Sequence, residues 1–94
     1  MDPFWLNVNA ALDKLQKCRT VDEALSVLNE HFDTQGCDAF FAGGSGDRTV
    51  WETLTEAGWQ IIWSEADYFY VIEDLEGNVM TYIEGDVCRG DQRS

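Results

Sequence analysis

Aspartate and glutamate are the residues of this sequence with the greatest capacity for chemistry. Nine carboxylates lie between Thr49 and Cys88, a stretch that holds no lysine or arginine. Paired carboxylates can perform acid–base catalysis or hold a divalent cation. The densest groups, at residues 73–76 and 84–86, lack the ligand spacing of a calcium loop, and glycosidase-type catalysis needs two carboxylates across a shaped cleft. We interpret these acids as solvated or partner-binding groups, with a carboxylate-based, metal-dependent hydrolase as an alternative.

Other residue types that perform catalysis are sparse. His31 is the only histidine, and it falls near the end of a predicted helix without a second ligand at metal-binding spacing. Ser45 stands in the segment GGSGDR, which has neither a nucleophile-elbow pattern nor a phosphate-loop lysine. Three cysteines (Cys18, Cys37 and Cys88) form no Cys-x-x-Cys pair, so we expect reduced structural thiols. The sequence predicts no catalytic residue, metal ligand or cofactor site, and we expect a protein that is not an enzyme.

The charge of the chain excludes several classes of partner. Eighteen acidic residues face six basic ones, which gives a net charge of −12. Such a chain is repelled by the phosphates of nucleic acids and by anionic membranes. The nine acids of the base-free stretch contribute −9 of that charge, so the excess is regional. Charge adapted to high salt would be spread over the whole surface, whereas a regional excess favours recognition of a basic protein surface.

Length and hydropathy predict one domain spanning residues 1–94. Ninety-four residues, 45% of them hydrophobic, are enough for one core and too few for two. No apolar segment approaches the roughly 20 residues of a membrane helix. The first residues, MDPFW, lack the basic start of a signal peptide, so we expect a cytoplasmic location. The polar tail at residues 90–94 is expected to fray.

Before the extended region of the chain, the sequence pattern predicts three helices. Asp2 and Pro3 predict a helix start, followed by an apolar stripe and a stop near residues 18–20. Thr20 with Glu23 forms a capping box for a second helix, which makes a helical hairpin with the first. Thr49 with Glu52 predicts the cap of a third helix that ends at Gly58. The stripe of the first helix comprises Phe4, Val8, Ala11, Leu12, Leu15 and Cys18.

Beyond Gly58 the pattern becomes extended. Runs of aromatic and branched residues at 59–64, 68–73 and 79–84 predict a three-stranded antiparallel meander, and hence an α+β fold with the three helices packed on it. Gly77 suits the left-handed position of a type I turn with a bulge, although a two-residue turn at 76–77 remains open. Residues 39–42 form either a short strand or a helical turn.

Aromatic side chains concentrate in the same base-free stretch. Both faces of the predicted strands are largely apolar, so the second face needs a cover: residues 39–42, the helices, or a partner such as a second copy. Tyrosine is favoured at interfaces because it joins a large apolar area to a polar tip. We predict a partner-binding surface made of Glu65, Asp67, Tyr68, Tyr70, Glu73, Asp74, Glu76, Glu84 and Asp86.

A resemblance is carried by residues 58–71, GWQIIWSEADYFYV, and 77–87, GNVMTYIEGDV. These segments resemble small acidic accessory proteins encoded by actinobacterial phages. The resemblance implies a cytoplasmic, non-virion protein that engages a host protein, and it carries no catalytic motif.

Together these features predict a non-enzymatic acidic protein that binds and occludes a basic surface of a host DNA-binding protein or nuclease. One version is a DNA mimic, in which carboxylates stand where duplex phosphates would be. An immunity or antitoxin-like inhibitor of a basic nuclease is the alternative, because the same charge pattern would serve it. A homodimer through the sheet also remains open.

Overall fold

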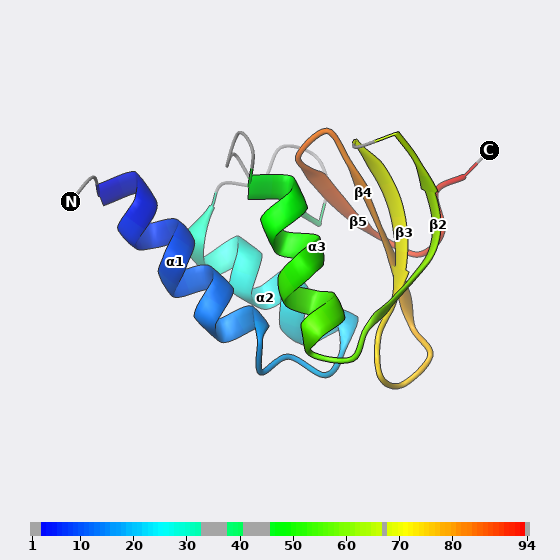
Figure 1. Cartoon of the computed structure of the whole chain (residues 1–94), viewed down its shortest axis with the longest axis horizontal. Helices are drawn as coiled ribbons and strands as arrows, with labels where there is room; N and C mark the ends of the chain where they lie inside the picture. Colours follow the sequence, from blue (N-terminus) through cyan, green and yellow to red (C-terminus); the bar gives the residue numbers. More distant parts are fainter. Residues whose placement is uncertain (1–2, 33–37, 41–45, 67, 94) are drawn as a thin grey trace.

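The computed structural model describes residues 3–32, 38–40, 46–66 and 68–93, and confirms the α+β class (Figure 1). Helices cover one face of an antiparallel sheet. The elements in chain order are α1 (Pro3–Leu15), α2 (Val21–His31), β1 (Ala39–Phe40), α3 (Gly46–Glu56), β2 (Gln60–Glu65), β3 (Phe69–Glu73), β4 (Val79–Ile83) and β5 (Asp86–Arg89).

The sheet contains more strands than the sequence pattern predicted. Its order is β1-β5-β4-β3-β2, with every neighbouring pair antiparallel, so β2 to β5 form a four-stranded meander and β1 adds two residues beside β5. The expected three-stranded meander lacked β5. Glu84 and Gly85 both have positive φ, 49° and 99°, and form a two-residue turn that pairs Ile83 with Asp86. Such a turn reverses the chain at once. Residues 39–40 are a strand, while 41–42 lie outside the described residues.

Two of the predicted helix boundaries are confirmed and two are wrong. α1 ends at Leu15, before the predicted stop near residues 18–20. The Thr20 side chain accepts a hydrogen bond from the Glu23 amide at 3.2 Å, which is the N-cap bond of a capping box. The Glu23 side chain reaches back to the Arg19 amide, at 3.3 Å, one residue before the cap. Gly58 has φ +103° and ends α3 in a Schellman motif, with Trp59 N donating to Leu54 O at 3.0 Å. The start of α3 is Gly46 rather than Thr49, which lies inside the helix. Asp2 is outside the described residues.

The core lies between the helices and one face of the sheet. Trp51 of α3 packs on Tyr70 of β3 and Tyr82 of β4, with ring centroids 4.6 and 5.3 Å apart. The Trp59 indole donates to Cys18 O at 3.1 Å and so links the residue before β2 to the connection between α1 and α2. Phe4 departs from the predicted stripe, because its side chain is exposed at the start of α1 while the rest of the stripe is buried or half-buried.

The C-terminal segment covers part of the opposite face of the sheet. Tyr70 faces α3, so its neighbour Val71, which pairs with Thr81, faces the other way. Both Val71 and Thr81 are nonetheless buried. The Thr81 hydroxyl donates to Gly90 O at 2.8 Å and accepts from Gln92 N at 2.9 Å. Residues 90–93 therefore lie against this face, on the side away from the helices (Figure 1).

The connection between β3 and β4 settles the register that the sequence left open. Asp74 N donates to Asn78 O at 2.8 Å, and Gly77 has φ +89°. These contacts close a three-residue loop with glycine in its left-handed position, which is the type I turn with a bulge. Glu73 consequently pairs with Val79.

Candidate functional site

The meander separates the predicted acidic surface into two groups. Connections alternate between the two ends of an antiparallel sheet, so residues 65–68 and 84–86 lie at one end while residues 73–76 lie at the other. A five-residue strand is about 17 Å long at ~3.4 Å per residue. The acids of the base-free stretch therefore do not share one surface. Asp67 belongs to the first group by sequence, but it lies outside the described residues.

At the first end, two hairpin turns lie side by side. Glu84 N, in the turn between β4 and β5, donates to Tyr68 O, in the connection between β2 and β3, at 2.9 Å. Tyr68, Glu65 and Glu84 are exposed, and Asp86 is half-buried. We call these four residues the hairpin-end surface. Among the described residues, none of its three carboxylates accepts a hydrogen bond or forms an ion pair.

At the other end, Asp74 is held inside the protein. Its carboxylate accepts hydrogen bonds from the amides of Val21 at 2.7 Å, Glu76 at 2.8 Å and Asn78 at 2.9 Å, and from the Asn78 side chain at 3.3 Å. Only 6% of the residue is exposed. Burial raises the pKa of Asp74, but the hydrogen bonds outweigh it, so the pKa lies below its ordinary value. Asp74 is a structural residue rather than a partner-binding one.

Tyr70 is also removed from the predicted surface. It is half-buried beneath Trp51 on the helix-covered face. Glu73 is half-buried at the end of β3, whereas Glu76 is exposed in the following turn. Of the predicted partner-binding residues, the structure thus brings together Glu65, Tyr68, Glu84 and Asp86 and separates the rest from them.

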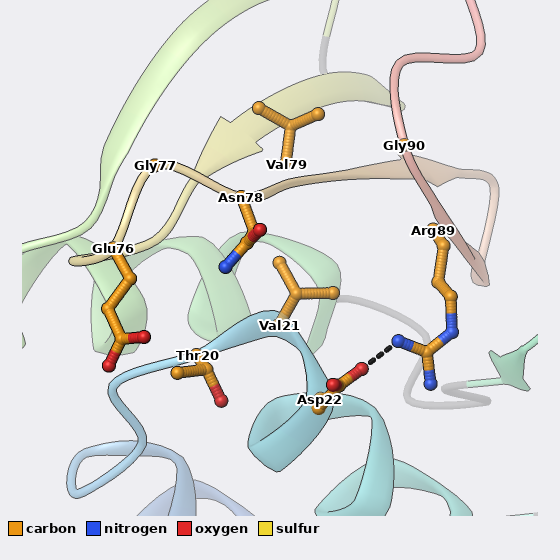
Figure 2. A pocket seen from close by; sticks show the side chains of 9 residues that line it. All are labelled: Thr20, Val21, Asp22, Glu76, Gly77, Asn78, Val79, Arg89 and Gly90. Atoms are coloured by element: carbon orange, nitrogen blue, oxygen red, sulfur yellow. Dashed lines mark hydrogen bonds and ion pairs between the residues drawn. The ribbon is translucent and has the colours of Figure 1, made fainter.

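A polar pocket of about 530 Å³ lies between the start of α2, the turn after β3 and the end of β5. Figure 2 shows Arg89 on one side of this pocket, paired with Asp22, and Glu76 on the other side. Among the described residues that line it, Arg89 is the only basic one, and it also approaches Asp38, with Nε 3.8 Å from Oδ2. This guanidinium is therefore already balanced by two carboxylates, and the described lining offers no further positive charge for an anion.

The remaining reactive side chains have structural surroundings. His31 Nδ1 lies 2.7 Å from Asn7 Oδ1, which links the end of α2 to α1. Burial, with a smaller contribution from the Glu23 charge, raises the pKa of the Cys18 thiol to about 11, which leaves it protonated and unreactive at neutral pH. Cys18 and Cys88 are free thiols, and Cys37 lies outside the described residues. In the described part of the chain, no group of three or more His, Cys, Asp or Glu side chains could hold a metal ion.

A local signal existed for part of this arrangement. Aspartate is common at the first position of a type I turn, and Asp74 stands three residues before Gly77. Its bond to Val21, 53 residues earlier, had no local signal. The pairing of Tyr68 with Glu84 continues the register in which Phe69 pairs with Ile83, so it depended on the turn at Gly77 that the sequence left open.

Comparisons with protein-family models, with curated proteins and with solved structures find no match to this chain. No helix among its described residues is both long enough and apolar enough to cross a bilayer.

Proposed function

We propose that the chain is a non-enzymatic binding protein whose hairpin-end surface recognises a basic surface of another protein. One observation carries the proposal. The Glu84–Tyr68 hydrogen bond joins two turns, so that an exposed tyrosine lies at the same end of the sheet as three carboxylates without described partners. Unpaired, hydrated carboxylates cost little in the free protein and gain charge-assisted hydrogen bonds when a lysine or arginine approaches. The tyrosine supplies buried area to the same interface.

The geometry favours a compact acidic surface over a DNA-like row of charges. Duplex DNA carries about one charge per 1.7 Å of its axis, so a mimic needs ordered acids along a whole face. Here the acids of residues 65–86 lie at opposite ends of the sheet, and Asp74 is committed to internal hydrogen bonds. Occlusion of a basic protein, including inhibition of a basic nuclease, requires only the compact surface.

The proposal also includes the source of the protein and the compartment in which it acts. The resemblance of residues 58–87 to actinobacterial phage accessory proteins supports a phage-encoded protein that acts on a host protein in the cytoplasm. A carboxylate-based hydrolase is not favoured, because the acids at the two ends of the sheet do not converge on one cleft.

Charge reversal at the hairpin-end surface tests the proposal. We compare the wild type with the triple variant Glu65→Lys, Glu84→Lys, Asp86→Lys in affinity capture from an actinobacterial lysate, with quantification of captured basic proteins. The matched control, Asp13→Lys, Glu30→Lys, Glu76→Lys, changes the net charge equally at exposed acids elsewhere. Circular dichroism verifies that both variants fold.

We expect the first variant to capture at least tenfold less basic protein than the wild type, and the control to capture as much as the wild type. Equal losses in both variants would mean that only net charge matters. Full retention by the first variant would contradict the proposed surface directly.

A further inference from the structure

β2 forms one outer edge of the sheet and is unusually open. Its six residues read QIIWSE, and all except Trp63 are exposed. Within the described ranges of the chain, no strand pairs with its outer side, whereas its inner side pairs with β3. Alternate residues of an edge strand leave their backbone N–H and C=O groups unpaired. β2 therefore offers main-chain donors and acceptors along an accessible strand.

This edge carries few of the features that usually block strand addition. Natural edges are often shortened, as β1 is with two residues, or carry lysine or proline. β2 has neither lysine nor proline. Its protective features are the charge of Glu65 at its end and a bulge at Ile62, where the register with β3 shifts between Ile61 and Trp63. The bulge changes the twist of the strand but leaves the residues on either side of it available.

Apolar side chains flank the edge on both faces of the sheet. Ile61 pairs with Ile72 on the helix-covered face and is 40% exposed, and the bulged Ile62 is 45% exposed. On the other face, Trp63 packs edge-on against Phe69 with centroids 4.7 Å apart. A strand added beside β2 would bury part of this surface as well as satisfying the backbone groups.

The charge around the edge of β2 favours a basic segment over a second copy of the chain. Glu65 ends β2, Glu56 ends α3 just before it, and Glu73 pairs across from Gln60. One cation, Arg93, lies 5.5 Å from the Trp63 ring centroid, but it is paired with Asp91. A second copy would bring the same carboxylates together in one sheet, which like-charge repulsion opposes. A lysine- or arginine-bearing segment would find complementary charge.

We propose that the outer edge of β2 binds an extended, basic segment of another protein as an added strand. This inference rests on the proposed function and deepens it, because it names the form that the basic partner takes. Main-chain pairing supplies affinity that depends little on sequence, and alternate basic side chains of the segment reach the carboxylates around the edge.

The test uses a synthetic eight-residue peptide of alternating lysine and valine with blocked ends, titrated into the 15N-labelled chain. We expect amide shifts and slowed hydrogen exchange along residues 60–65. The same peptide with backbone N-methyl groups keeps every charge but cannot donate to β2, and we expect it to bind at least tenfold more weakly. Ile62→Lys should weaken the unmodified peptide about fivefold to tenfold. Leu6→Lys, at an apolar position on α1 that is 53% exposed, should not.

Four other outcomes would overturn the inference, and each identifies the part of it that is wrong. If the peptide binds without protection of residues 60–65, and the hairpin-end triple variant abolishes that binding, the edge is wrong and the proposed function stands. Equal binding by the N-methylated peptide excludes main-chain pairing. Absence of binding at millimolar peptide excludes a receptive edge. If the free chain sediments as a dimer with the β2 amides already protected, the occupant is a second copy.

Discussion

Asp74 joins two parts of the chain that are far apart in sequence. Its carboxylate accepts the Val21 amide at the first turn of α2 and two amides of its own turn. The first N–H groups of a helix have no partner within the helix, and a negative charge there is favoured by the helix dipole. A second bond, from Leu75 N to Arg19 O at 3.2 Å, reinforces the junction. Asp74 therefore has a structural role.

Replacing Asp74 with alanine should be strongly destabilising. The change leaves the amides of Val21, Glu76 and Asn78 without their acceptor, and a buried unsatisfied donor costs about 1–3 kcal/mol. We expect a loss of about 3 kcal/mol in the free energy of unfolding, measured by urea denaturation. Glu76→Ala is the control, because that exposed side chain should contribute less than about 0.5 kcal/mol. Similar losses in the two variants would refute the structural role.

The lowered pKa of Asp74 also predicts a pH dependence of stability. Because the folded pKa lies below the unfolded value of about 3.9, the unfolded state binds the proton more readily. The contribution of Asp74 is complete above the unfolded pKa and is lost as the pH falls through the folded pKa. We expect the stability difference between wild type and Asp74→Asn to shrink between about pH 5 and pH 2. A difference that is constant over this range would contradict the assigned pKa direction.

At the scale of elements, the end of α3 determines how β2 enters the sheet. The Schellman motif at Gly58 reverses the chain, and Trp59 immediately enters the core, with only 2% of its surface exposed. A Cβ at Gly58 would lie 3.0 Å from Leu75 Cδ2, whereas a Cβ at Gly77 would meet nothing within 4 Å. Both glycines have positive φ, so they differ mainly in the space around them.

These two glycines make a matched pair of substitutions. Gly77→Ala should cost about 1 kcal/mol, the penalty for placing an ordinary residue in the left-handed region. Gly58→Ala should cost about 2 kcal/mol, because the new methyl group also has to displace Leu75. Chemical denaturation of both variants measures the difference. Equal costs would show that the exposed Leu75 side chain moves aside freely.

At the scale of the whole molecule, twelve net negative charges are carried by a body measuring 38 × 24 × 22 Å. The Debye length is about 30 Å at 0.01 M salt, so screening is weak and most of the carboxylates repel one another across the molecule. It falls to about 3 Å at 1 M salt, where only close pairs still interact. The described ion pairs, such as Lys14 with Glu30 at 2.8 Å, offset little of this repulsion because they are exposed.

Salt should therefore stabilise the protein. We expect the melting temperature to rise by about 5 °C between 0.01 and 0.5 M sodium chloride, which corresponds to roughly 1 kcal/mol for a domain of this size. The neutral variant Glu65→Gln, Glu84→Gln, Asp86→Asn should show a smaller rise, because it lacks three of the repelling charges. Calorimetry at both salt concentrations checks the effect, and a fall in melting temperature with salt would contradict it.

Signals that act within a few residues were sufficient for several elements of this fold. The cap at Thr20 and the glycine at the end of α3 depend on backbone preferences and short hydrogen bonds, and both were predicted correctly. For the turn at Gly77 the sequence left two turn types open, and the structure has the type I turn with a bulge. The α+β class and three of the strands followed from hydrophobic periodicity. β5 was missed because Glu84 adopts a positive φ that glutamate rarely takes, so its turn carried a weak signal.

Residue type and charge determined that the excess of acid is regional, since neither depends on the fold. Only the packed chain determined where each acid lies. The meander sends Glu65 and Glu84 to one end of the sheet and Asp74 to the other, and α2 then encloses Asp74 through Val21. Contacts over 53 residues arise from the folding of the whole chain, and no local pattern encodes them.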